Sequence, residues 1–269
     1  MLAIKNNLMA ANAARYLGQS YDALATSVER LSSGLRINSA SDDAAGMAVR
    51  ELMRADIAVL EQGARNAQDG VSMLQTMEGA LQTIDNLMVR MQQLAEQSAT
   101  GSYSSAQRTI MNNEFGQMSE EITRIAEATD FNGIKMLDNS ATVSVHFGGE
   151  SDKIDVAGSK MTATGLGINA LSVSTDASAR AALTTLDSAI NTKDTARAKF
   201  GYMMNRLEST GEVLGIQSEN LSAAESRISD VDVATEMATL TRNQVLSQAG
   251  TSMLSQANSI PQMALTLLR

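Results

Sequence analysis

The chain contains no cysteine, no tryptophan and a single proline in 269 residues. The absence of cysteine excludes disulfides, thiol catalysis and thiolate metal sites. Aromatic residues make up 3% of the chain, which leaves little for stacking on nucleic-acid bases. Acidic residues outnumber basic ones by 30 to 21, and the net charge of −9 argues against a nucleic-acid partner.

The sequence also lacks long apolar runs. No stretch of about 18 apolar residues is present, so we expect no membrane-spanning segment and no membrane partner. The first residues, MLAIKNNLMAANAARYLG, do not have the uninterrupted apolar core of a secretory signal. If the protein leaves the cell, we expect a route that needs neither feature.

The two ends of the chain carry amphipathic helical patterns with almost no charge. From Met237 to Leu268 there is no Asp or Glu and only one Arg. Apolar residues in this C-terminal stretch recur at helical spacing, at Leu246, Ala249, Met253, Ala257, Ile260, Ala264 and Leu267. Residues 3–35 carry a similar stripe, with a near-heptad period, at Leu17, Tyr21, Leu24, Val28, Leu31 and Leu35.

A helix with an apolar stripe and an uncharged back is a poor surface for a soluble monomer. We therefore predict that the two terminal helices pair through their stripes and that other copies of the chain cover their backs. Because such helices gain little by folding alone, we also expect them to be disordered before assembly.

The middle of the chain predicts a mainly α fold of long antiparallel helices forming a coiled-coil rod, with a small β-hairpin region at about 140–175. After a break at 36–40, Ser39 or Ser41 is expected to cap a helix running to about Ser98. Glycines in this stretch leave two possibilities open, either close helix packing or two helices joined near Asp69–Gly70.

Three further helices follow in the prediction. One runs from the loop at 99–105 to about Thr129, one covers about 177–224, and the last opens at a capping box of Ser229 and Asp232. The hairpin, which leaves room for a third short strand, is indicated by apolar residues alternating with polar ones at Val143, Val145, Phe147, Ile154 and Val156. We expect a terminal coiled-coil domain of 1–41 with 226–269, and an outer helical domain of 42–225.

No group of residues in the sequence suggests catalysis. His146 is the only histidine, and the strand pattern places it opposite Val145 and Phe147, facing solvent. The pairs Asp42–Asp43 and Asp230–Asp232 lack the glycine and distal glutamate of a calcium loop, so helix capping is the better interpretation. We expect no enzymatic activity, no metal and no cofactor.

Several motifs resemble those of bacterial flagellin. They are ERLSSGLRINSASDDAAGMAV (Glu29–Val49), RNAQDGVSMLQTMEGAL (Arg65–Leu81), FNGIKML (Phe131–Leu137), NLSAAESRISDVDVATEM (Asn220–Met237), QAGTSMLSQAN and the terminal LLR (Leu267–Arg269). The resemblance covers roughly 1–140 and 175–269. It departs from many members in the middle, where large flagellins carry outer domains and this chain has only the hairpin region.

The resemblance implies a secreted, extracellular filament subunit for swimming motility. It implies that the terminal helices form an inner coiled coil and that subunits pass unfolded through the flagellar type III channel. The expected partners are further copies of the chain, an export chaperone and the filament cap. It also implies recognition by a host Toll-like receptor, at positions that match Arg90, Leu94 and Glu114 in this sequence.

Three alternatives to a flagellin are less consistent with the sequence. A flagellin-like hook–filament junction protein shares the end motifs, but the terminal QAGTSMLSQAN and LLR favour flagellin proper. A cytosolic coiled-coil adaptor is expected to have charged positions flanking its heptads, which these ends lack. An enzyme is the weakest of the three, because no residues are available to carry the chemistry.

Overall fold

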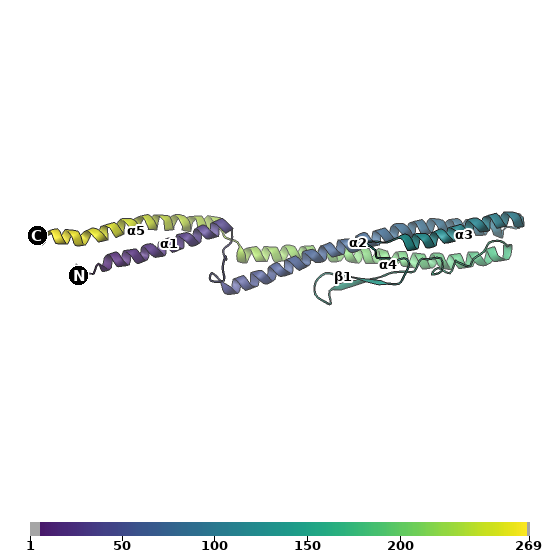
Figure 1. Ribbon diagram of the computed structural model, residues 1–269, viewed down its shortest axis with the longest axis horizontal. Helices are drawn as coiled ribbons and strands as arrows, with labels where there is room; N and C mark the ends of the chain where they lie inside the picture. The colour runs from purple at the N-terminus through teal and green to yellow at the C-terminus, as the bar shows by residue number, and fades with distance from the viewer. Residues whose placement is uncertain (1–5, 268–269) are drawn as a thin grey trace. The chain divides into compact units, whose positions relative to one another are not determined.

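A computed structural model describes residues 6–267, with side chains described as far as Ile260. Within this range the chain forms five helices and one two-stranded sheet (Figure 1). In chain order they are α1 (Leu8–Ser33), α2 (Ala44–Ala99), α3 (Ser105–Ala128), β1 (Thr142–His146), β2 (Lys153–Ala157), α4 (Asp176–Ser229) and α5 (Val233–Leu267). The mainly α prediction, with a small hairpin near the middle of the chain, is confirmed.

The chain divides into two compact units. A terminal unit consists of Met1–Ile57 and Glu219–Arg269, and a central unit consists of Ala58–Ser218. Helices α2 and α4 are continuous through these limits, so each contributes one part to each unit. The division into domains of 1–41 with 226–269 and of 42–225 stays a prediction.

In the terminal unit, α1 and α5 lie side by side and antiparallel (Figure 1). Near the start of α1, Asn7 Nδ2 donates a hydrogen bond to the Ala257 carbonyl at 2.8 Å. Near its end, an Arg30 guanidinium nitrogen lies 3.9 Å from a Glu236 carboxylate oxygen. Two contacts whose residue numbers run in opposite directions along the helices fix the antiparallel arrangement.

The joints of the terminal unit are tied together by backbone hydrogen bonds. The Arg36 N–H donates to the Ser229 carbonyl at 2.6 Å, and the Val231 N–H donates to the Gly34 carbonyl at 3.0 Å. The Arg36 guanidinium adds two hydrogen bonds to the Ile228 carbonyl. These bonds join the segment after α1 to the segment between α4 and α5, although the two are far apart in the sequence.

An aspartate caps the helix at each of these joints, so the serine caps were predicted wrongly, whereas the capping role expected of the aspartate pairs Asp42–Asp43 and Asp230–Asp232 is confirmed. Asp43 Oδ1 accepts the Gly46 N–H at 2.9 Å and so caps α2, in place of Ser39 or Ser41. Asp232 Oδ1 accepts the Ala234 N–H at 3.0 Å at the start of α5. Ser229 instead ends α4. Aspartate is as good an N-cap as serine, so residue type alone did not decide between neighbouring candidates.

In the central unit, α2 is a single helix through Asp69–Gly70, which decides between the two sequence interpretations in favour of close packing. A Cβ at Gly70 would lie 3.0 Å from Leu207 Cδ1 and 3.3 Å from Val145 Cγ2. A Cβ at Gly63 would collide with the backbone of Phe147. These two glycines therefore let α4 and the hairpin approach α2 closely, which offsets their cost of about 1 kcal/mol each in a helix.

The core of the central unit is a continuous apolar cluster shared by α2, α3, α4 and the hairpin. Its buried members include Leu74, Met77, Leu81, Ile84, Met88 and Met91 of α2, Met111, Phe115 and Ile122 of α3, and Ala182, Leu186, Ala189, Phe200 and Leu207 of α4. Methionine fills irregular gaps between helices well, because its side chain is unbranched and flexible.

Charged groups cross the contact between α2 and α4 in antiparallel order. Arg197 pairs with Glu78, Lys193 pairs with Asp85, and Gln92 donates a hydrogen bond to Asp187 at 3.0 Å. The Lys193 side chain is only 2% exposed. Burial alone would lower the pKa of Lys193, but hydrogen bonds from its ammonium to Asp194 and Asp85 outweigh burial and raise that pKa.

The hairpin pairs β1 with β2 antiparallel, with Val143 opposite Val156 and Val145 opposite Ile154. Val145 and Phe147 are buried, whereas His146 between them is exposed, as the alternation predicts. No third strand forms in the segment from Gly158 to Thr175, which the structure describes in full.

Candidate assembly surface

The contact between α1 and α5 is built from alternating larger and smaller side chains. We call it the seam; its buried or half-buried members are Ala13, Leu17, Ser20, Leu24, Ser27 and Leu31 of α1, and Leu240, Asn243, Ser247, Gly250, Leu254 and Ala257 of α5. The spacing alternates between three and four residues on both helices, as expected for two helices that pack along a heptad seam. Leu17 packs against Gly250, where an added Cβ would lie 3.0 Å from Leu17 Cδ1.

The most buried positions of the seam are polar. Ser27 is 2% exposed, Ser247 is 6% exposed and Asn243 is 8% exposed. The Ser247 hydroxyl donates to the Asn243 carbonyl of its own helix at 2.8 Å, so it does not hold the two helices together. Small and polar side chains remove little apolar surface from water, so the seam contributes less hydrophobic stabilisation than one built of large apolar residues alone.

The predicted pairing stripe of α1 only partly coincides with the seam. Leu17, Leu24 and Leu31 lie in it, and Leu35 is half-buried just beyond the helix. Tyr21 and Val28, which were expected to pair, are instead 49% and 52% exposed. A helix that carries large apolar residues on two faces gives two stripes of similar strength, and the periodicity of the larger residues did not reveal that serines fill alternate seam positions.

The predicted stripe of α5 differs more from the seam. Leu246 is 49% exposed and Met253 is 63% exposed, and Ala249 is also exposed, so these three point away from α1. Ala257 is buried and Ile260 is half-buried. The side chains of Ala264 and Leu267 lie outside those that the structure describes. As a pairing face the predicted α5 stripe is therefore wrong for its first three members, and its role in self-assembly stays a prediction.

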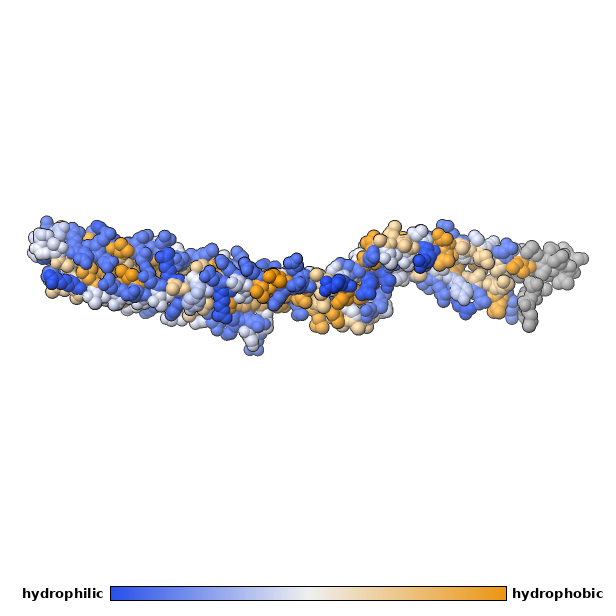
Figure 2. Space-filling model, turned by 180° about the vertical axis from the view of Figure 1, so that it is seen from behind, coloured by the Kyte–Doolittle hydropathy of each residue, from blue (hydrophilic) through white to orange (hydrophobic). Residues whose placement is uncertain are grey.

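The outward-facing apolar residues of the two helices form what we call the outer apolar surface. It consists of Leu8, Met9, Tyr16, Tyr21 and Val28 of α1 and of Val233, Met237, Val245, Leu246 and Met253 of α5, which are between 48% and 72% exposed. Figure 2 shows apolar residues at the surface over these terminal helices. So many large apolar side chains on one helix pair indicate a surface for protein contact.

The three receptor positions inferred from the resemblance do not lie on one exposed surface. Arg90 of α2 and Glu114 of α3 form an exposed ion pair, with Arg90 Nη2 2.9 Å from Glu114 Oε1. Leu94 is only 1% exposed and belongs to the core of the central unit. Leu94 is therefore corrected from a surface contact to a core residue, although it lies only one helical turn after Arg90.

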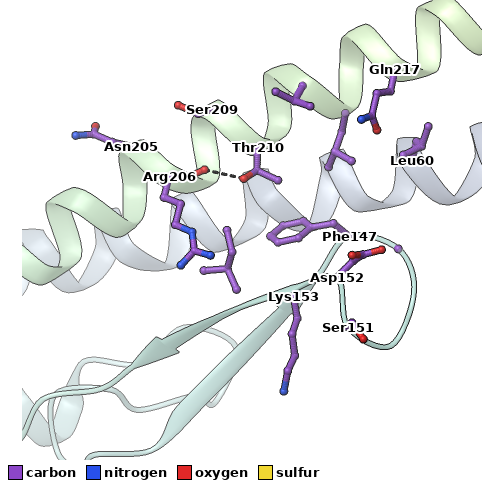
Figure 3. Close-up of a pocket in the computed structure, with 14 residues that line it drawn as sticks. Leu60, Phe147, Ser151, Asp152, Lys153, Asn205, Arg206, Ser209, Thr210 and Gln217 are labelled. Carbon is purple, nitrogen blue, oxygen red and sulfur yellow. Dashed lines mark hydrogen bonds between the residues drawn. The ribbon is translucent and has the colours of Figure 1, made fainter.

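An open groove of about 850 Å³ lies between the hairpin turn and α4 in the central unit (Figure 3). Figure 3 shows the Phe147 ring directed towards the helices and Lys153 directed away from them. Neither histidine nor cysteine lines this groove, so it offers no activated nucleophile of the usual kind. We assign it no catalytic role.

The described residues offer no site for a metal ion and no helix for a membrane. Among them, no three or more His, Cys, Asp or Glu side chains are grouped so that they could hold a metal ion. Within residues 6–267, none of the helices combines the length and the hydropathy needed to cross a bilayer.

The sequence matches two family regions that together take up most of the chain. Residues 4–142 match the bacterial flagellin N-terminal helical region, and residues 183–268 match the bacterial flagellin C-terminal helical region. The chain belongs to the bacterial flagellin family. The members of this family are structural proteins.

Relatives of this flagellin match it over nearly its full length. A flagellin of Halalkalibacterium halodurans is 43% identical over 99% of both chains. The flagellar filament 33 kDa core protein of Treponema phagedenis is 42% identical, also over 99% of both chains. The crystal structure of Bacillus cereus flagellin is similar with a TM-score of 0.51 and 32% identity, and it covers 60% of this chain and 94% of that chain.

Proposed function

We propose that the chain is the structural subunit of a bacterial flagellar filament, and that it polymerises by burying the outer apolar surface of its terminal helices against neighbouring copies. The observation that carries this mechanism is the exposure of large apolar side chains on both α1 and α5. Family membership and the filament names of full-length relatives support the filament as the product.

The apolar side chains that the seam leaves uncovered give assembly its driving force. Where α1 and α5 pair, the most buried side chains between them are small or polar, and larger apolar ones stay in water. The hydrophobic stabilisation that these larger side chains can supply, about 25 cal/mol per Å² of apolar surface, becomes available only when another copy covers them. Subunits related head-to-tail, without ring closure, then grow into an open helical polymer.

The first test removes the whole helix. A variant lacking Met237–Arg269 is expected to keep a folded central unit by circular dichroism and to form no filaments in electron micrographs. Filaments from the truncated chain would overturn the proposed mechanism.

The second test targets the surface alone. Val245→Glu places a charge on an outward-facing side chain that is 59% exposed, so the monomer should tolerate it while polymerisation stops. The matched control is Ile110→Glu, which introduces the same charge on a 69% exposed apolar side chain of α3 in the central unit. Equal loss of filaments from both variants would show that the terminal pair has no special role.

Further partners and the location of the product follow from the flagellin resemblance. We propose that the subunit is secreted through the flagellar export channel with an export chaperone, and that it is added beneath a filament cap outside the cell. The absence of charge from most of α5 supports a chaperone that shields it before export, since an uncovered apolar surface invites aggregation.

We also propose that a host Toll-like receptor contacts the central unit at Arg90 and Glu114. Both side chains are partly exposed and adjacent, which gives a receptor one paired polar feature on neighbouring helices. Arg90→Ala in soluble monomer should lower receptor activation in a reporter cell assay. Arg124→Ala, which breaks an exposed ion pair with Glu121 elsewhere on α3, is the matched control and should leave activation unchanged. Unchanged activation by Arg90→Ala would remove the proposed contact.

A further inference from the structure

The methionines of this chain are distributed unequally between the two units. The chain has 17 of them. All methionines of the central unit are buried or half-buried; they are Met73, Met77, Met88, Met91, Met111, Met118, Met136, Met161, Met203 and Met204. In the terminal unit, by contrast, Met9 is 65% exposed, Met237 is 48% exposed and Met253 is 63% exposed. Among the described side chains, the exposed methionines thus all belong to α1 and α5.

These three side chains are part of the outer apolar surface. Met9 follows Leu8, which is 72% exposed, and Met237 and Met253 lie on the same helix as Val245, which is 59% exposed. A thioether in such a place is open to small oxidants in solution, whereas the thioethers in the core of the central unit are shielded by packing. The exposure that makes the outer apolar surface suitable for protein contact therefore also makes its thioether sulfur atoms accessible to oxidants.

We propose that Met9, Met237 and Met253 are sites of reversible oxidation by peroxides, and that this oxidation controls whether the free subunit can polymerise. The inference rests on the proposed function, because it requires the outer apolar surface to be buried in the filament. Once the filament has formed, the same sulfur atoms are covered, so the modification acts on the subunit before assembly.

The chemistry needs only the peroxide as co-reactant. A sulfur lone pair attacks one peroxide oxygen, the O–O bond breaks, and the products are a sulfoxide and water. Sulfur loses two electrons and the peroxide gains them. A dithiol reductant reverses the change with a methionine sulfoxide reductase, forming the thioether, water and a disulfide of the reductant.

The sulfoxide changes the surface from apolar to polar. Its oxygen is a hydrogen-bond acceptor, and burying such a group without a donor costs free energy. The neighbouring side chains on the outer apolar surface are mostly aliphatic, and an aliphatic side chain cannot donate a hydrogen bond to the sulfoxide. We therefore expect the critical concentration for polymerisation to rise by about tenfold when these methionines are oxidised.

The experiment treats purified monomer with dilute hydrogen peroxide and locates sulfoxides by peptide mass spectrometry. Met9, Met237 and Met253 should oxidise before the methionines of the central unit, and the critical concentration should rise. Incubation with methionine sulfoxide reductases and dithiothreitol should restore it. Filaments treated in the same way should remain unmodified at these positions.

Two triple variants assign the effect to the surface. Substitution of Met9, Met237 and Met253 by leucine, which conserves volume and apolarity, should leave polymerisation unaffected by peroxide. Leucine at Met118, Met203 and Met204, half-buried in the central unit, is the matched control and should leave the sensitivity intact.

Three results would overturn the proposal. They are an unchanged critical concentration after oxidation, a surface leucine variant that remains as sensitive as the wild type, and failure of the reductases to restore polymerisation. Failure of the untreated protein to form filaments is a separate result, because it would remove the proposed function before any oxidant is added.

Discussion

The central unit is held together by buried methionine, leucine and phenylalanine side chains, whereas in the terminal unit small and polar residues alternate with half-buried leucines where the two helices meet. Both units use long antiparallel helices, so the difference lies in side chains rather than in architecture. The central unit buries most of its large apolar side chains in its own core, whereas the terminal helices leave many of theirs exposed to a neighbour. Stability and assembly are thus assigned to different parts of one chain.

The largest expected effect compares the same substitution in both units. Leu81→Ala removes a fully buried side chain of the central core and should lower the free energy of unfolding by about 2–5 kcal/mol. Leu24→Ala in the half-buried seam should cost well under that in the monomer, because part of the side chain is already in water. Urea unfolding followed by circular dichroism measures both, and equal losses would contradict the division of roles.

A smaller change in the free energy of unfolding is expected when the buried ion pair of the central unit is broken. Asp85→Asn leaves the buried ammonium of Lys193 with a weaker partner and should destabilise the unit by roughly 1–3 kcal/mol.

The matched change, Lys193→Met, replaces the buried charge by an apolar side chain of similar length and should be close to neutral or stabilising. Thermal unfolding of the two variants beside the wild type distinguishes them. If Lys193→Met proved the more damaging, the ion pair would be a net source of stability.

An apolar substitution in the seam should strengthen the pairing of α1 with α5. Asn243→Leu replaces a polar side chain that is 8% exposed at the α1–α5 contact. Burying the new side chain should stabilise the terminal pair by about 1–2 kcal/mol. Hydrogen exchange of α5 amides should slow accordingly, with those of α3 as the internal reference. Faster exchange in α5 would mean that Asn243 specifies the pairing rather than weakening it.

The smallest expected effect is a loss of stability at the helix joints in acid. Hydrogen bonds from the Ser39 and Asn38 backbone lower the pKa of Asp42, and those from the Thr235 hydroxyl and nearby backbone lower the pKa of Asp232. Because both pKa values fall below the usual 3.8 on folding, the two carboxylates stabilise the joints above that pH.

That contribution is lost as the pH falls through the lowered values. Hydrogen exchange in the first turn of α5 should therefore accelerate in acid, before exchange in the central core does. Asp232→Asn keeps a capping side chain without a titrating charge and should flatten this dependence. An unchanged acid profile in that variant would assign the effect to another group.

Periodicity predicted where the helices lie but not which face each one presents. The three-and-four rhythm located α2, α3, α4 and the terminal pair because long amphipathic helices repeat their pattern many times. It misplaced Tyr21, Leu246 and Met253, since an uncharged helix offers two apolar faces and the small residues of a seam give no hydrophobic signal. The periodicity of one helix does not show which of its faces contacts the neighbouring helix.

Contacts between segments far apart in the chain also could not be predicted from the sequence. The pairing of Lys193 with Asp85 depends on the antiparallel register of α2 and α4, which only the packed structure supplies. The burial of Leu94 follows from the direction in which α2 faces α3 and α4, so a motif match alone placed it wrongly on the surface. The hairpin was predictable because alternation over a few residues specifies both strands and their inward side.

The hydrogen bond from Asn7 to Ala257 places the beginning of α1 beside the later part of α5. The chain therefore begins beside the later part of α5, continues through the whole central unit, and returns along α5 to the same end of the terminal pair. Length added at the exposed turn of Gly148, Gly149 and Glu150 would change neither where the chain starts nor where it returns. The hairpin turn can therefore change in length and sequence without changing the terminal helices, which we propose make the contacts between subunits.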